Sequence, residues 1–317
     1  MKIETAVTRL LAIDLPILQA GMSWASSDAA LPLAVSAAGG LGVIGAGPMR
    51  AADLARVIDA VAAGGRPYAV NLPLYRPGAE EILDLIIARR IPVLIASQGG
   101  PARYLARAHA AGIVCLHVVA GVEHAAKARA AGVDGLVVVG GEAGGHPPAE
   151  LVSTLVVVRA VVRAMGGLPV VASGGFADGA GLLAALSLGA GAANFGTRFM
   201  ATPEAAVHAG YKQAVLDAGV ASTRTIGAGL GIIRTLTNAF AERMVGLELA
   251  GAPLEERRAA FAAGTLKMAA LEGDMAEGKL EAGQSAGLID DIVPAGALVA
   301  RIAQEYAAAL GALPRVA

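Results

Sequence analysis

The chain has few aromatic residues and a single cysteine. Only 3% of its 317 residues are aromatic, which argues against a surface that binds nucleic acid by base stacking. The formal net charge of −1 also gives no basic surface for a nucleic-acid backbone. One cysteine, Cys115, excludes an internal disulfide and is typical of a reducing compartment. We therefore expect a cytoplasmic protein without a nucleic-acid partner.

The amino-terminal segment lacks the long apolar region and small-residue cleavage site of a signal peptide. Two long stretches, 29–49 and 179–197, carry no charged residue. Pro32 and several glycines interrupt them, so each is more typical of a helix, a turn and a strand than of a membrane span of about 20 residues. We expect no membrane partner.

Short apolar segments alternate with alanine-rich segments of helical periodicity along the first two thirds of the chain. The apolar segments are 15–20, 41–46, 67–72, 91–96, 113–119, 135–140, 168–173 and 192–196, and the helical ones include 51–64, 79–90, 101–112 and 122–132. Regular alternation of this kind predicts parallel strands joined by right-handed crossovers. Eight such units predict an α/β fold, a (β/α)8 TIM barrel, over residues 1–218. A doubly wound open sheet is the alternative.

The alternation stops after Ala218. Residues 219–285 show no strand pattern, but they include helix-like segments at 234–249 and 254–274 and a glycine-rich loop at 273–287. We expect 219–285 to form a small helical lid. The remaining segment, 286–317, contains an amphipathic pattern that predicts a C-terminal helix packed back on the barrel.

Small residues follow the seventh and eighth predicted strands, as Ser173-Gly174-Gly175 and Gly196-Thr197. In TIM barrels the loops at these two positions frequently bind phosphate. Glycine has no Cβ, so its backbone N–H groups can approach phosphate oxygens closely, and Thr197 adds a hydroxyl. Glycines also relieve crowding at turns, but two matched positions on adjacent strands favour a phosphate site.

His146 is the candidate acid or base. It lies in an irregular loop, 140–151, after the sixth predicted strand, at the end of the barrel where active sites form. Imidazole titrates near neutral pH and is suited to proton transfer; the alternative is a histidine that stabilises the loop. Of the other histidines, we expect His109 and His124 on outer helices, His208 in the last barrel helix and His117 packed within the fifth strand.

Other reactive groups are scarce at the predicted strand ends. None of the five lysines lies there, which argues against a Schiff base, and Cys115 lies within a predicted strand, where a core role is expected. No cluster has the spacing of metal ligands, so we expect no metal. Only Glu142 and Glu150 are acidic residues near the active-site end. A phosphate site with one acid or base is typical of enzymes whose cofactor supplies the chemistry.

At these residues the sequence resembles the FMN-dependent nitronate monooxygenases, a family that also includes flavin-dependent enoyl-ACP reductases and some quinone reductases. The resemblance covers nearly the whole chain. It is carried by LPILQAGM (15–22), AAGGLGVIGAG (37–47), AVNLPL (69–74), EAGGH (142–146), PVVASGGFADG (169–179), NFGTRFMATPEA (194–205) and AGQSAGLIDDI (282–292).

The resemblance implies a role for each of these segments. FMN would lie over the barrel, its phosphate bound by Ser173, Gly174, Gly175, Gly196 and Thr197. Met22 and Asn71 would contact the flavin ring, and Gly144 and Gly145 would let the loop pass close to it. His146 matches the catalytic histidine of the family.

The resemblance implies oxidation of alkyl nitronates with O2 as the leading activity. The alternatives on the same scaffold are NAD(P)H-dependent reduction of enoyl-ACP or enoyl-CoA and NAD(P)H:quinone reduction; a non-redox phosphate-binding barrel is an alternative of another class. Val118 stands where some nitronate and quinone branches carry lysine, which favours the enoyl reductases. Pro147 and Pro148 stiffen the loop after His146. The partners expected are a small-molecule substrate and O2 or NAD(P)H, and a homodimer is left open.

Overall fold

Eight parallel strands form a barrel in the computed structural model, which describes residues 1–314. The strands are β1 (Ile17–Gln19), β2 (Gly42–Gly45), β3 (Tyr68–Pro73), β4 (Val93–Ser97), β5 (Val114–Val119), β6 (Gly135–Val139), β7 (Val170–Ser173) and β8 (Ala192–Phe195). Neighbours in the sequence are neighbours in the sheet, and β1 also pairs with β8. The predicted (β/α)8 barrel is confirmed.

The barrel closes between β1 and β2 through a single parallel bridge, Leu18 to Leu41. The side chain of Gln19 extends this short ladder. Its Oε1 accepts a hydrogen bond from the N–H of Val43 at 3.0 Å, and its Nε2 donates to the carbonyl of Val43 at 3.2 Å. Gln19 is fully buried. One side-chain amide thus takes the place of a peptide group in the ring, which satisfies backbone groups that have no access to water.

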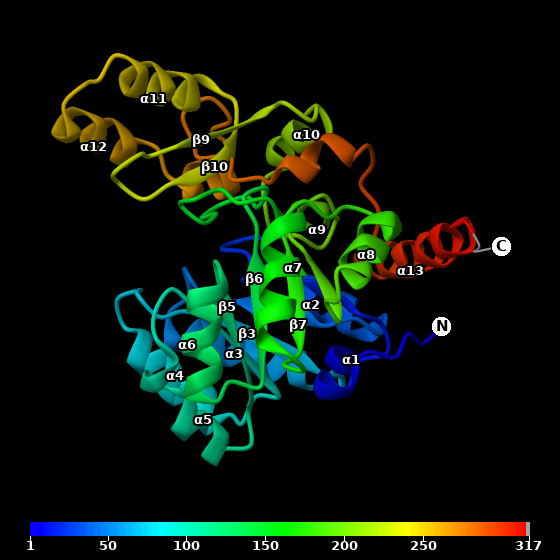
Figure 1. Ribbon diagram of the computed structural model, residues 1–317. Coiled ribbons are helices and arrows are strands. Elements are labelled where there is room, and N and C mark those ends of the chain that lie inside the picture. Colours follow the sequence, from blue (N-terminus) through cyan, green and yellow to red (C-terminus); the bar gives the residue numbers. More distant parts are fainter. Residues whose placement is uncertain (315–317) are drawn as a thin grey trace.

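Helices surround the strands (Figure 1). They are α1 (Ala6–Leu11), α2 (Ala30–Ala37), α3 (Ala51–Ala62), α4 (Ala79–Ala88), α5 (Leu105–Ala110), α6 (Val122–Ala131), α7 (Thr154–Met165), α8 (Gly179–Ser187), α9 (Thr197–Met200) and α10 (Ala209–Leu216). The main core fills the space between strands and helices, and a second cluster fills the barrel interior. Val7 and Leu11 of α1 belong to the interior cluster, so α1 covers the amino-terminal end of the barrel.

The helix predicted at 101–112 is broken in the structure. A 3-10 turn, Pro101–Arg103, precedes α5, and Tyr104 between them leaves helical geometry at φ −124°. Tyr104 is fully buried, and its hydroxyl lies 2.9 Å from Nδ1 of His117. Tertiary packing of the Tyr104 ring therefore overrides the helical periodicity of this segment.

The segment after the barrel contains a β-hairpin, which the sequence did not predict within 219–285. β9 (Thr223–Ile226) pairs antiparallel with β10 (Ile233–Leu236). The predicted helix at 234–249 begins only at α11 (Ala239–Leu249), because its first three residues belong to β10. α12 (Leu254–Ala263) and a π-helical turn, Met268–Glu272, follow. Figure 1 shows β9, β10, α11 and α12 grouped beyond one end of the barrel.

The C-terminal helix α13 (Ala295–Gly311) lies beside α8 on the barrel wall (Figure 1). Its apolar residues, including Leu298, Val299 and Ile302, are buried in the main core. The 3-10 turn η3 (Gln284–Leu288) precedes it. Across residues 1–314, no helix combines the length and the apolar character needed to cross a bilayer.

Replacing Gln19 with alanine tests the closure of the ring. The variant leaves the N–H and carbonyl of Val43 buried without their partner, and we expect the free energy of unfolding to fall by about 3 kcal/mol. Urea unfolding followed by circular dichroism measures this loss. Gln304→Ala, on the exposed face of α13, is the matched control, and equal midpoints for the two variants would contradict the role given to Gln19.

Candidate active site

A cavity of about 550 Å³ opens at the carboxyl ends of the barrel strands. This volume is typical of small-molecule sites. Every site residue that the sequence predicts lines it: Met22, Asn71, Gly144, Gly145, His146, Ser173, Gly174, Gly175, Gly196 and Thr197. The structure thus brings these ten residues together, although their roles remain predictions.

The turn after β7 forms one wall of the cavity. Gly174 and Gly175 have φ of +106° and +83°, a region that favours glycine. A Cβ on Gly174 would lie 2.9 Å from Oγ1 of Thr154, so the turn has no room for a side chain there. Ser173 is held by Asn194, whose Nδ2 donates to the serine Oγ at 3.0 Å. The turn therefore presents backbone and a fixed hydroxyl to the cavity.

The N-terminus of α8, which follows this turn, already has acidic partners. The carboxylate of Asp178 accepts a hydrogen bond from the N–H of Gly181 at 2.7 Å, and that of Glu305 accepts one from Gly179 at 2.9 Å. Two carboxylates thus occupy the helix end where an anion would otherwise bind. A phosphate at this wall would depend on the β7 turn and on the start of α9, not on α8.

The turn after β8 completes the same wall. Gly196 lies opposite Met22, whose Sδ would be 3.8 Å from a Cβ on that glycine. Thr197 begins α9, and the first N–H groups of a helix have no partner within it. Its Oγ1 accepts a hydrogen bond from the N–H of Gly283 at 2.9 Å, which leaves the hydroxyl proton available to a ligand. The two turns form a cradle with the donors that a phosphate group requires.

Met22 and Asn71 lie on adjoining parts of the cavity lining. Nδ2 of Asn71 donates to the carbonyl of Ile95 at 3.1 Å, which fixes the amide at the end of β3. A Cβ on Gly21 would lie 2.4 Å from Cβ of Asn71. Only glycine at position 21 therefore leaves room for the side chain of Asn71. The sequence did not reveal this packing role.

The loop that carries His146 is bound to the β9–β10 hairpin at two points. Gly145 and Arg234 form an antiparallel bridge, with N···O distances of 2.7 and 3.2 Å. The buried guanidinium of Arg234 donates two hydrogen bonds to the carbonyl of Gly141, at 3.1 and 2.7 Å, and one to Oγ1 of Thr223. One arginine thus fixes the loop at two of its glycines, Gly141 and Gly145.

The segment before η3 packs against the middle of the same loop. A Cβ on Gly144 would lie 2.5 Å from the backbone N of Gly283, so only glycine fits there. The N–H of Gln284 donates to the carbonyl of Glu142 at 3.0 Å. The loop is therefore held between two late parts of the chain, and the exposed imidazole of His146 lies at the cavity.

Four ionisable residues of the cavity, Tyr75, Arg76, Tyr211 and Glu281, were not predicted, and the last two are in contact. Tyr211 of α10 is fully buried, and its hydroxyl donates to the backbone carbonyl of Glu281 at 2.9 Å. Burial raises the pKa of Tyr211 well above its usual value. Burial also raises the pKa of Glu281, while the nearby charges of His146 and Lys279 act in the opposite direction. Tyr211 lies in the last barrel helix and Glu281 in the segment after the barrel. Neither position follows a predicted strand, so no sequence signal placed them here.

The other polar residues that the sequence analysis considered have structural roles. His117 is packed among the helices outside the barrel, and burial lowers its pKa. His208 caps α10 instead of lying within it, since its Nδ1 accepts from the N–H of Gly210. The carboxylate of Glu142 turns away to cap α7, where it accepts from the N–H and hydroxyl of Thr154 at 2.8 and 2.7 Å. The carboxylate that lines the cavity is that of Glu281.

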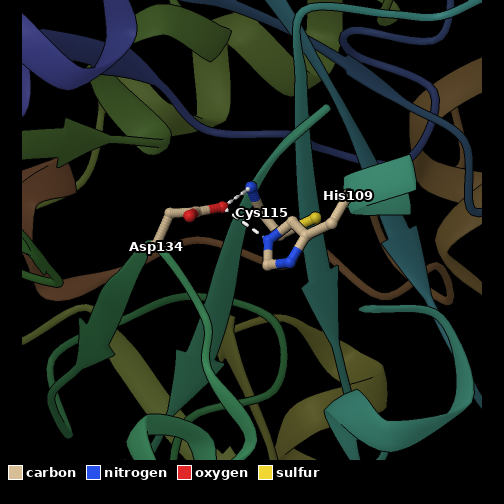
Figure 2. A group of neighbouring side chains, drawn as sticks. All are labelled: His109, Cys115 and Asp134. Atoms are coloured by element: carbon tan, nitrogen blue, oxygen red, sulfur yellow. Dashed lines mark hydrogen bonds and ion pairs between the residues drawn. The ribbon is translucent and has the colours of Figure 1, made fainter. Parts of the chain in front are cut away.

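A second cluster of polar side chains lies where β5 and β6 begin, away from the cavity (Figure 2). Oδ2 of Asp134 accepts a hydrogen bond from the N–H of Cys115 at 2.7 Å and lies 2.9 Å from Nε2 of His109. Burial raises the pKa of the Cys115 thiol to about 12, which disfavours the thiolate that binds metals. Asp134 has two partners in this arrangement, which gives the cluster a structural role.

Comparison with known proteins extends over nearly the whole chain. The nitronate monooxygenase family model matches residues 4–84 and 76–305. A nitronate monooxygenase of Paraburkholderia phytofirmans is 31% identical, over 95% of this chain and 95% of its own length. A Mycobacterium tuberculosis protein named (3aS,4S,5R,7aS)-5-hydroxy-7a-methyl-1-oxo-octahydro-1H-indene-4-carboxyl-CoA dehydrogenase is 33% identical, over 92% of this chain and 93% of its own length.

Among solved structures, FabK from Thermotoga maritima superimposes with a TM-score of 0.92 at 37% identity, and the match covers 98% of each chain. The agreement includes the barrel and the segment that follows it. Together, the family model and these relatives make the protein an oxidoreductase. The chain belongs to the nitronate monooxygenase family, as its sequence motifs predicted.

Proposed function

We propose that the protein binds FMN in this cavity and oxidises alkyl nitronates with O2. The cradle of the β7 and β8 turns is the observation that carries the proposal, because its glycines, its serine and its threonine suit the terminal phosphate. Met22 and Asn71 would face the flavin ring. Bound FMN would supply the electron transfer, and the chain would supply binding, orientation and proton control.

His146 would contact the substrate in this proposal. It is the one histidine that lines the cavity within residues 1–314, and the rigid loop fixes its backbone. A protonated imidazole would donate a hydrogen bond to a nitronate oxygen. With a neutral nitroalkane in the site, a neutral imidazole would instead accept the proton of the carbon beside the nitro group, which gives the nitronate. Either role requires the ring to face the space above the flavin.

Reduction of an enoyl thioester is the second candidate. Val118 lines the cavity, where a lysine would place a cation near the flavin. The relative named as a carboxyl-CoA dehydrogenase shows that acyl-CoA compounds are substrates on a similar chain. In this reaction NAD(P)H would be the reductant, and His146 would assist the reduction.

The two candidates differ in what reduces the flavin. We expect the purified protein to be yellow, and we expect an alkyl nitronate alone to bleach its absorbance near 450 nm in anaerobic stopped flow. Rapid bleaching by NADH or NADPH, with none by nitronates, would instead support the enoyl reductase. A colourless protein that takes up no added FMN would exclude both.

Replacing His146 with alanine tests its part in turnover. We expect the variant to retain FMN and to lose roughly 100-fold in turnover, because a positioned acid or base contributes about that much. Steady-state oxygen consumption measures the rate, and the flavin spectrum checks the loading. Exposed His124 of α6 provides the control variant His124→Ala. Wild-type rates in His146→Ala would contradict the assignment.

Replacing Gly174 with alanine tests the phosphate cradle. A Cβ there would lie 2.9 Å from Oγ1 of Thr154 at a φ of +106°. We expect the Kd for FMN to rise roughly 10-fold or more through loss of a charged hydrogen bond. Gly167→Ala is the control, because Gly167 also has a positive φ, +83°, but has nothing within 4 Å of the added Cβ. Equal affinities in the two variants would place the phosphate elsewhere.

A further inference from the structure

Arg76 is a cation of the cavity that has no acidic partner. It lies in the turn between β3 and α4, and it lines the cavity together with its exposed neighbour Tyr75. Arg76 is partly buried, and within residues 1–314 no carboxylate forms an ion pair with it. A partly buried charge without a counter-ion is costly. An anionic ligand beside Arg76 would remove this cost.

Two backbone carbonyls fix the guanidinium of Arg76 against the cavity wall. Nη1 donates to the carbonyl of Ala46 and Nη2 to that of Met49, each at 2.8 Å. Gly47 and Pro48, which lie between these two residues, line the cavity. A guanidinium has five N–H groups, and within residues 1–314 only the two bonds to these carbonyls use them. The group is therefore positioned in advance and still has donors for a ligand.

The hydroxyl of Ser23 lies beside the same wall. A Cβ on Gly47 would be 2.8 Å from Oγ of Ser23, and Ser23 also lines the cavity. Within residues 1–314 this hydroxyl has no hydrogen-bond partner. Carboxylate and phosphate oxygens accept hydrogen bonds from guanidinium and hydroxyl groups alike. The wall thus offers a charged donor and a neutral donor to an oxyanion.

This wall is separate from the phosphate cradle. β3 precedes Arg76 and β7 precedes Gly174, and these two strands lie on opposite sides of the ring of eight. A phosphate bound at the β7 and β8 turns would therefore leave Arg76 to another ligand. Arg76 also lies beyond the end of β3, next to a tyrosine that is 65% exposed, whereas Asn71 lies within the strand. The guanidinium is thus on the solvent side of the position proposed for the flavin ring.

We propose that Arg76 binds an oxyanion group of the substrate, a carboxylate or a phosphate, in a part of the substrate away from its reacting carbon. The proposal rests on the proposed function, because FMN in the cradle leaves the opposite wall to the substrate. A planar guanidinium matches two oxygens of such a group. Arg76 is then a specificity-determining residue that favours anionic substrates over neutral ones of the same size.

Calorimetric titration of the FMN-loaded protein tests this site without turnover, since FMN occupies the cradle. The probes are glutarate with its neutral diamide, glutaramide, and ADP with adenosine. We expect at least one of the two anions to bind, and we expect Arg76→Gln to raise its Kd roughly 10-fold or more through loss of a charged hydrogen bond. The neutral partner should respond equally in both proteins, which distinguishes a lost charge from a distorted turn. Arg76→Lys, which keeps the charge but not the planar fork, should give an intermediate Kd.

The two anions distinguish the source of the oxyanion. An effect of Arg76→Gln on glutarate identifies a carboxylate site, and an effect on ADP identifies a phosphate site. Equal anion affinities in the wild type and in Arg76→Gln would overturn the proposal, and so would a wild type that binds neither anion.

Arg103→Gln is the matched control. Arg103 also donates to the turn after β3, at the carbonyl of Leu74 at 3.3 Å, but it pairs with Glu80 and lies outside the cavity lining. Its loss should leave the Kd of each anion unchanged. Nitronates that fail to bleach the flavin would count against the proposed function alone, because the titration depends on no reaction.

Discussion

The closure of the barrel depends on the side-chain amide of Gln19, which makes hydrogen bonds that a backbone peptide group would otherwise make. β1 and β2 share one backbone bridge, and the buried amide of Gln19 supplies the next pair of hydrogen bonds through Val43. Without this contact, two backbone groups of Val43 would be buried and unpaired, and only the Leu18–Leu41 bridge would join β1 to β2. The parallel pairing of β1 with β8 places the turn after β1 beside the turn after β8, so that Met22 faces Gly196 across the cavity.

The site needs a second constraint, because the barrel alone does not fix the His146 loop. Arg234 and Gly283 come from parts of the chain that follow the barrel, and they hold the loop at Gly141, Gly144 and Gly145. The loop has glycines because the backbones of these two segments approach it closely. The part of the chain after the barrel thus has a direct structural role in the site, since the β9–β10 hairpin and the segment before η3 pack against the loop.

Much of this arrangement could be predicted from the sequence. The eight apolar segments matched the strands, and the rule that active sites lie at carboxyl ends of strands selected residues that do line one cavity. The β9–β10 hairpin was missed because its strands have four residues each and the second continues into a helical pattern. The role of Gln19 could have been suspected, because it is the one amide in an otherwise apolar segment. The position of Glu281 could not, because only tertiary packing brings its segment to the histidine loop.

Arg234 and Gly283 lie after the barrel strands in the sequence, so the ribosome makes them later. A ribosome that has released the eight barrel strands has made every residue of the phosphate cradle, but not the segments that hold the His146 loop. In the nascent chain, both turns are therefore made before the residues that hold the His146 loop. A chain cut short after α10 would therefore keep both turns but lack the contacts that Arg234 and Gly283 make with the His146 loop.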